Sequence, residues 1–349
     1  MRSSYSEKDV CLLLKDITGK VEPLPTEERE KMIQQGKHYS EMLPIEYVPT
    51  PKYMEVYQEA LTHYAKRTAL AVGSLADKII AKKGKKTVLV SLARAGTPIG
   101  ILLKHYIFRK YHMDLPHYSI SIIRGRGIDG NAMKYLLQKY PPEALLFVDG
   151  WIGKGAILKE LKKDIAVYQG VSSDIAVLAD PANMTRLCGT HDDILIPSSC
   201  LNATVSGLIS RTFLRDDVIG KDDFHGAVYY GNLAASDLSY DFIDTIEAEF
   251  TMENPALDIR SEGSGIEEAK EIALKFGIED INFIKPGIGE TTRVLLRRVP
   301  WKVLVDRRFA GDKSLAHIIR LAEEKHVPIE YYPLKHYKTC GIIRKLADA

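Results

Sequence analysis

Residues 145–156 combine an apolar stretch, an acidic residue and a glycine-rich turn that carries a lysine. Asp149 directly follows the apolar residues, and Lys154 stands between Gly153 and Gly155. Backbone N–H groups at the start of a helix attract anions, and glycines let a phosphate approach the backbone closely. The segment therefore predicts a phosphate-binding turn. It is not a Walker A loop, because the order of its glycines and lysine differs from that motif.

Two segments further upstream carry arginines beside glycines. Arg94 follows the apolar residues 88–92 in a short turn, where it would face a pyrophosphate or simply point to solvent. Arg124 and Arg126 alternate with glycines in residues 121–130, a composition that suits a loop folding over a polyanion, or an ordinary surface loop. The residues predicted to contact the ligand through these turns are Gly96, Thr97, Gly150, Gly153, Lys154, Gly155 and Ala156.

Cysteine and histidine residues offer a second kind of chemistry. Cys200 and His225 could form a thiolate–imidazole pair, for which the two residues need not be close in sequence. The alternative is that Cys200 is a small buried residue and His225 a hydrogen-bonded structural histidine. Cys188 and His191 are three residues apart but lack a second ligand pair, so we predict no metal site.

Short apolar runs, which predict strands, alternate along the chain with segments of helical periodicity, and these strands and helices must position the residues named above. This alternation predicts an α/β fold with a parallel sheet, whose ligands bind at the carboxyl ends of the strands. Residues 181–254 are rich in small polar side chains and are expected to form a cap beside the sheet. The predicted units are an N-terminal arm at 1–55, a ligand-binding domain with its cap at 56–254, and an α/β domain at 255–349. The last domain is expected to contain a strand at 280–283 and to end in a helix that begins at Gly341.

Charge is unevenly distributed along the 349 residues, whose formal net charge is only +2. Residues 285–349 contain 14 Lys and Arg against 7 Asp and Glu, an excess of seven positive charges (14 − 7) that favours a polyanionic partner. Arg293, Arg297 and Arg298 share one helical face by their spacing. The N-terminal part contains no apolar run of membrane-spanning length, and the scattered cysteines fit a reducing cytoplasm, so we expect a cytoplasmic protein without a membrane partner.

The turn at residues 145–156 resembles the ribose-5-phosphate loop of type I phosphoribosyltransferases. Asp149 stands at the first acid of that loop, Gly150 replaces the second acid, and Lys154 stands at the first threonine. The resemblance implies a type I phosphoribosyltransferase-like sheet and a pentosyltransferase that binds phosphoribosyl pyrophosphate with Mg²⁺ carried on the substrate. Its catalytic residues would be Asp149, Arg94, Arg124 and Arg126.

Nearly the whole chain resembles one family, the phosphoribosyltransferase–Pelota fusion proteins of bacterial tellurite-resistance and stress gene clusters. The shared motifs include D-G-W-I-G-K-G at 149–155, C-G-T at 188–190 and D-F-H-G at 223–226. Some members of this family are labelled cysteine proteases. The family implies transfer of a ribose phosphate to a base or an RNA-linked acceptor. A cysteine hydrolase that uses Cys200 and His225, and a non-catalytic nucleotide-sensing RNA-binding protein, are the alternatives.

Residues 287–293 resemble the kink-turn-binding motif of Pelota-type domains, with Gly289 where the motif has asparagine. This resemblance implies a C-terminal Pelota-like domain that binds RNA by shape and backbone contacts. The residues implied in RNA binding are Lys285, Gly287, Gly289, Glu290, Arg293, Arg297 and Arg298. The acceptor, the RNA target and the oligomeric state do not follow from these motifs.

Overall fold

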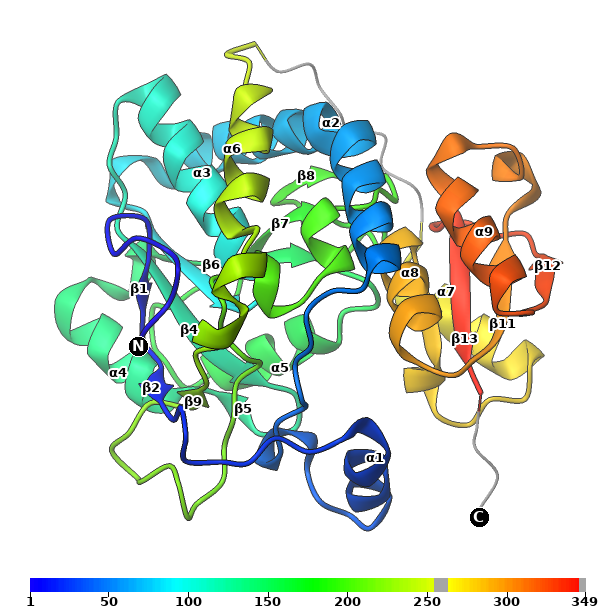
Figure 1. Cartoon of the computed structure of the whole chain (residues 1–349). Coiled ribbons are helices and arrows are strands. Elements are labelled where there is room, and N and C mark those ends of the chain that lie inside the picture. Colours follow the sequence, from blue (N-terminus) through cyan, green and yellow to red (C-terminus); the bar gives the residue numbers. More distant parts are fainter. Residues whose placement is uncertain (254–262, 345–349) are drawn as a thin grey trace.

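The computed structural model describes residues 1–253 and 263–344, which form two α/β domains side by side (Figure 1). The N-terminal domain is built on a mainly parallel sheet in the order β1-β4-β3-β6-β7-β8, and β5 pairs with β4 in the antiparallel direction. Its strands are β1 (Cys11–Leu12), β3 (Val88–Ala93), β4 (His117–Ile123), β5 (Gly127–Ile128), β6 (Leu145–Trp151), β7 (Ile175–Ala179) and β8 (Cys188–Thr190). A small separate ladder pairs β2 (Lys15–Asp16) with β9 (Gly226–Ala227).

Alternating side chains of these buried strands enter two apolar clusters, one on each face of the sheet, as the twofold repeat of a strand requires. Leu89, Leu146 and Leu178 pack toward the helices α2, α3 and α6. Val90 and Phe147, the next residues along β3 and β6, point to the opposite face of the sheet and pack against α4 and α5. The helices are α1 (Thr26–Gln34), α2 (Pro51–Lys83), α3 (Gly96–Tyr111), α4 (Gly130–Lys139), α5 (Ala156–Ile165) and α6 (Ser239–Ala248).

The strand order reverses between β3 and β6, because the chain leaves β3 toward β4 on one side and returns to β6 on the other. Loops that leave the carboxyl ends of two such strands diverge and open a crevice, which is where open α/β sheets bind ligands. The turn after β3 begins with Arg94, and β6 runs through Asp149. The fold thus places two predicted site residues at the crevice.

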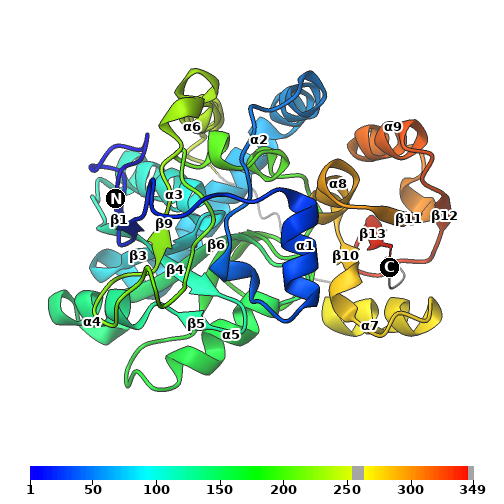
Figure 2. The same cartoon turned by 60° about the horizontal axis from the view of Figure 1, so that its bottom comes forward.

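The C-terminal domain, residues 263–344, has a four-stranded sheet in the order β10-β13-β11-β12. Val303 and Val305 face α8 and α9, whereas Leu304 between them faces α7, so helices cover both sheet faces (Figure 2). The elements are α7 (Gly265–Lys275), β10 (Ile284–Pro286), α8 (Ile288–Arg297), β11 (Pro300–Val305), α9 (Ala316–Glu324), β12 (Ile329–Tyr331) and β13 (Thr339–Ile343).

Two predicted elements of this domain are wrong. The helix expected from Gly341 is instead the strand β13, because Cys340 and Ile342 alternate into the core between β10 and β11. The strand expected at 280–283 is a 3-10 turn at Ile281–Phe283, where the Asp280 side chain caps the turn, and the strand follows as β10.

Residues 181–253 do not form one separate cap. The strand β8 extends the parallel sheet beyond β7, and α6 packs on α2 and α3. The expected N-terminal arm is also part of the fold, since β1 pairs with β4 and α2 begins at Pro51, before the predicted boundary at residue 56. No helix within the described residues is both long enough and apolar enough to cross a membrane. The predicted domain limit at 255 lies outside the described residues.

Candidate functional site

A pocket of about 360 Å³ lies at the crevice and extends to the C-terminal domain. Its N-terminal wall includes Arg94, Arg124, Asp149 and Lys154, which brings together side chains that are far apart in sequence. Its other wall consists of residues from β10 and from the start of α8: Ile284, Lys285, Pro286, Glu290 and Arg293. The pocket is therefore formed by both domains.

Asp149 and Lys154 are both partly buried, and this burial shifts the pKa of each side chain. Burial raises the pKa of Asp149 to about 7, although the Gly150 N–H donates a 2.8 Å hydrogen bond to its Oδ1 atom. Burial, followed by repulsion from Lys285, lowers the pKa of Lys154 to about 8. Lys154 Nζ donates to the carbonyl oxygens of Ile281 at 2.5 Å and Ile284 at 2.9 Å. The lysine of the predicted phosphate turn thus also joins the two domains.

The three predicted arginines have different surroundings. Arg94 donates to the Ile209 carbonyl at 3.0 Å and to Asn202 Oδ1 at 2.8 Å, and it lines the pocket. Arg124 also lines the pocket, from the turn between β4 and β5, and donates to Asn282 Oδ1 at 2.9 Å. Arg126 pairs instead with the Glu41 carboxylate and does not contribute to the pocket lining. The expected polyanion loop is a hairpin turn that presents one arginine to the pocket.

Most glycines and small residues of the predicted turns have a structural role: they allow close packing or an unusual backbone conformation. Gly96 lies where a Cβ atom would approach the Val148 carbonyl oxygen to 2.4 Å, so only glycine fits between β3 and β6. The Thr97 hydroxyl is buried and 2.7 Å from Ser119 Oγ, inside the sheet rather than in the pocket. Gly155 has a φ of +82°, a backbone conformation that favours glycine. Gly153, Gly155 and Ala156 line the pocket, and Gly150 does not.

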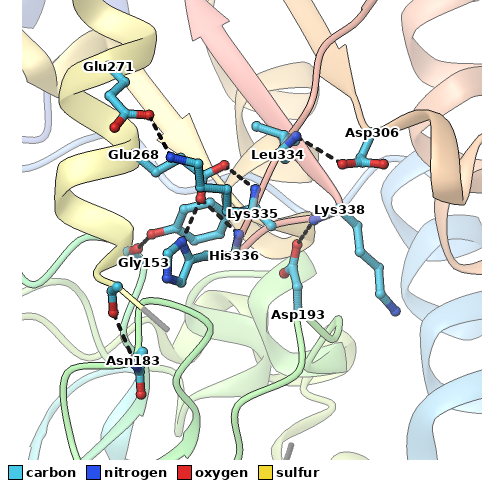
Figure 3. A network of polar contacts seen from close by, with 12 residues as sticks. Gly153, Asn183, Asp193, Glu268, Glu271, Asp306, Leu334, Lys335, His336 and Lys338 are labelled. Atoms are coloured by element: carbon cyan, nitrogen blue, oxygen red, sulfur yellow. Dashed lines mark hydrogen bonds and ion pairs between the residues drawn. The ribbon is translucent and has the colours of Figure 1, made fainter. Parts of the chain in front are cut away.

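The C-terminal residues that resemble the kink-turn motif face the N-terminal domain. Asp193 accepts hydrogen bonds from the backbone N–H groups of Ile288 and Lys338, each at 2.9 Å, and thereby holds the start of α8. Figure 3 shows the bond from Lys338. A Cβ atom at Gly287 would lie 3.1 Å from Asp193 Oδ1. Arg298 follows α8, and the Arg297 side chain lies outside the described part of the structure.

Cys200 and His225 lie in different parts of the fold. Cys200 is fully buried in an apolar cluster, in the 3-10 turn Pro197–Cys200 that packs against α2 and α8. His225 precedes β9, with its Nδ1 atom 2.8 Å from Ser121 Oγ and its backbone N–H donating to Asp129 Oδ2 at 2.6 Å. These positions match the alternative interpretation, a buried apolar cysteine and a structural histidine.

A closer thiol–imidazole pair is formed by Cys188 and His191, with 3.3 Å between Sγ and Nε2. His191 Nδ1 is 2.9 Å from the main-chain oxygen of Asp180, which can only accept a hydrogen bond, so Nδ1 carries the proton. Nε2 is then left with the lone pair that faces the thiol. The Asp180 carboxylate lies 3.6 Å from Nδ1, close enough to stabilise an imidazolium ion.

The spacing of Cys188 and His191 was visible in the sequence, but their acid partner was not. Asp180 follows β7 and His191 follows β8, and the parallel register that pairs Val177 with Cys188 and Ala179 with Thr190 brings the three together. One atom from each of Asp180, Cys188 and His191 lies within 4.8 Å of the others. This donor set of sulfur, nitrogen and oxygen also suits a transition metal ion such as Zn²⁺.

The pair is buried, and it lies next to the loop between β7 and β8. Cys188 is fully buried and His191 is 8% exposed. Hydrogen bonds within this loop hold its conformation: Asp180 Oδ2 accepts from the backbone N–H groups of Met184 and Thr185, at 2.7 Å each. The C-terminal domain holds the same loop, because Gly265 N–H donates to the Ala182 carbonyl at 3.0 Å.

The architecture defines a two-domain α/β protein with a basic crevice and a buried thiol–imidazole pair at strand β8 of its main sheet. The chain belongs to the family described as tellurite-like stress resistance cysteine protease StiP, whose model matches residues 3–247. The description of a PELOTA RNA binding domain matches residues 263–345. The chain is also 34% identical to the cysteine protease StiP of Acinetobacter baylyi, over 98% of this chain and 94% of the relative.

Two solved structures of a hypoxanthine-guanine phosphoribosyltransferase from Bacillus anthracis align with part of the chain. The first covers 41% of this chain and 76% of the enzyme at 13% identity, with a TM-score of 0.22. The second, with a HEPES molecule in its active site, covers 41% and 75% with the same identity and TM-score. Alignments this weak carry no argument about the fold or activity of the chain.

These comparisons correct the predicted enzyme class. The predicted family and its association with tellurite and stress resistance are confirmed. The assignment as a transferase, and specifically as a glycosyltransferase that moves a phosphoribosyl group, is wrong, because the relative that matches nearly the whole chain is named a cysteine protease.

Proposed function

We propose that this chain is a cysteine hydrolase that cleaves peptide bonds, with Cys188 as nucleophile and His191 as general base. The 3.3 Å contact between Cys188 Sγ and the unprotonated His191 Nε2 atom carries this proposal. The family name supports the reaction class, and the geometry favours Cys188 over Cys200 as the reacting thiol.

The reaction follows from the positions of the groups. His191 Nε2 takes the thiol proton, and the thiolate attacks the carbonyl carbon of the scissile peptide bond. The imidazolium returns the proton to the leaving amine as the C–N bond breaks, which leaves a thioester on Cys188. Water then hydrolyses the thioester, with His191 again accepting a proton, and the free thiol is restored. Asp180 is a positioning residue that holds the ring through its main-chain oxygen.

We expect His191→Gln to lower the rate of hydrolysis of unfolded casein by about 10²- to 10⁴-fold, because glutamine cannot accept the thiol proton. The matched control is His63→Gln, an exposed histidine whose Nδ1 contacts only the Glu59 carbonyl of its own helix. Full activity in His191→Gln would exclude this pair. Loss of the wild-type activity on adding a chelator would point to a metal centre at Asp180, Cys188 and His191 and would also overturn the proposal.

RNA binding by the C-terminal domain is a separate expectation, supported by the matching domain description. Of the residues predicted to contact RNA, Lys285, Glu290 and Arg293 line the pocket between the domains, so this part of the motif is not a free surface.

A further inference from the structure

The buried group of Asp180, Cys188 and His191 has the geometry of a metal site as well as that of a reactive thiol. One ligand atom from each of the three residues lies within 4.8 Å of the other two. Cys188 Sγ and His191 Nε2 are 3.3 Å apart. Sulfur at about 2.3 Å and nitrogen at about 2.0 Å from a tetrahedral Zn²⁺ ion would be separated by about 3.6 Å. A shift of a few tenths of an ångström would therefore let both atoms bind one ion.

The histidine and the carboxylate also have the outer contacts that metal ligands usually make. His191 Nδ1 is 2.9 Å from the main-chain oxygen of Asp180, which keeps the proton on Nδ1 and leaves the Nε2 lone pair for a ligand. Asp180 Oδ2 accepts hydrogen bonds from the N–H groups of Met184 and Thr185, so the orientation of the carboxylate is fixed. Outer contacts of this kind orient the ligands of a metal ion.

The backbone places the three donors before any ion binds. A Cβ atom at Gly189 would collide with the Ala71 carbonyl oxygen, so β8 packs directly on α2 at the residue after Cys188. The parallel pairing of Val177 with Cys188 fixes β8 against β7, the strand that Asp180 follows. An ion would thus meet donors whose positions the sheet has already set.

The chemical types of the donors select a soft or borderline divalent cation. Thiolate sulfur and imidazole nitrogen favour Zn²⁺ or Cd²⁺ over Mg²⁺ and Ca²⁺, which prefer oxygen ligands. A thiolate and a carboxylate together supply two negative charges, which balance the charge of the ion in this buried place. As the ion binds, the thiol proton leaves to solvent and the sulfur donates an electron pair to the metal.

We propose that the thiol–imidazole pair is also a reversible binding site for Zn²⁺ or a similar thiol-binding cation, and that the bound ion inhibits the hydrolase. The ion takes the lone pairs of Cys188 Sγ and His191 Nε2, which hydrolysis requires. Three protein donors leave the fourth position to water, unlike a structural zinc with four protein ligands, so the ion can exchange with a chelator. The prediction that there is no metal site used sequence spacing alone, which does not reveal Asp180.

The binding is tested by titrating the full chain with Co²⁺ and with Cd²⁺ in a Cys11→Ser background, which removes the exposed thiol. A metal–thiolate bond gives a charge-transfer absorption band that carboxylates and imidazoles alone do not give. We expect one such ion per chain. The band should be lost in Cys188→Ala, and the affinity should fall tenfold or more in His191→Gln and in Asp180→Asn.

Two substitutions away from the site are the matched controls. Cys340→Ala removes another buried cysteine, and His63→Gln removes an exposed histidine on α2. Both variants should give the wild-type titration. Thermal unfolding of each variant checks that a lost band reflects a lost ligand rather than a lost fold.

The inhibition rests on the proposed hydrolase function, whereas the binding does not. Saturating Zn²⁺ should lower casein hydrolysis at least tenfold, and a chelator should restore it. Zn²⁺ should also slow the alkylation of Cys188 by iodoacetamide at least tenfold, a readout that needs no activity. An inactive wild type that still binds the ion at Cys188 would refute the hydrolase and leave the ion site standing. Absence of the thiolate band, a band that persists in Cys188→Ala, or full hydrolysis with the site saturated would overturn the proposal.

Discussion

Cys188→Ala is expected to abolish peptide hydrolysis, with a loss of about 10³-fold or more, because no other group can form the thioester. The effect should exceed that of His191→Gln, since a thiol without its base still reacts slowly. Cys188 has no exposed surface, so alanine leaves only a small cavity, and Cys188→Ser provides a second variant of nearly the same shape. Turnover of a fluorogenic peptide substrate by each purified variant measures the effect.

Substitutions of two other buried cysteines, Cys340 and Cys200, show whether the loss of activity is specific to Cys188. Cys340 is equally buried, and burial raises its pKa to about 12, so Cys340→Ala should keep full activity. Cys200→Ala distinguishes the two candidate nucleophiles, because it should reduce activity only if Cys200 and His225 form the working pair. Activity that survives in Cys188→Ala and disappears in Cys200→Ala would contradict the assignment.

Asp193→Ala is expected to destabilise the whole chain by roughly 2–5 kcal/mol. The substitution leaves the buried N–H groups of Ile288 and Lys338 without their acceptor, and each such loss costs about 1–3 kcal/mol. These bonds join the two domains, so the substitution weakens the contact between them; Figure 3 shows the bond from Lys338. The change should lower the melting temperature by about 5–15 °C, as measured by calorimetry.

The adjacent carboxylate is the control for this substitution. Asp192 pairs with Arg67 at the surface, and exposed pairs contribute at most about 1 kcal/mol, so Asp192→Ala should change the melting temperature little. Equal melting temperatures of the two variants would show that the domain contact does not depend on Asp193.

The stability contributed by Asp193 should also depend on pH. Burial raises its pKa from 3.8 to about 6, so the folded protein binds the proton more readily than the unfolded chain. Stability from this group is then fully present below pH 3.8 and is lost as the pH rises through 6. The difference in stability between wild type and Asp193→Ala should therefore widen when the pH falls from 7 to 5. A difference that narrows would contradict this linkage.

Much of the fold follows from local sequence patterns. The apolar residues 88–92 lie in β3, and the apolar stretch that opens residues 145–156 lies in β6, since a continuous apolar run closed by a glycine-bearing turn leaves few alternatives. The segment from Gly341 was misassigned because the alternation of Cys340 and Ile342 is short, and only pairing with β10 and β11 makes it a strand. Tertiary contacts decide the structure of such short segments.

Some residues of the candidate site could likewise be predicted from local sequence, whereas others come together only through tertiary structure. The crevice residues Arg94, Arg124 and Lys154 were predictable, because strand ends that carry glycines and basic side chains meet at a reversal of strand order. The contribution of the second domain depends on how its α8 docks, which no local pattern encodes. Asp180 joins Cys188 and His191 only through the register of β7 and β8.

The most direct test of the hydrolase is covalent labelling with a thiol-directed peptidyl epoxide, located by peptide mass spectrometry. A Cys11→Ser background removes the exposed thiol, whose reaction would otherwise obscure the result. The predicted result is a single adduct on the peptide that contains Cys188, formed in parallel with loss of activity and formed much more slowly in His191→Gln. An adduct on Cys200, or inactivation without modification of Cys188, would contradict the account.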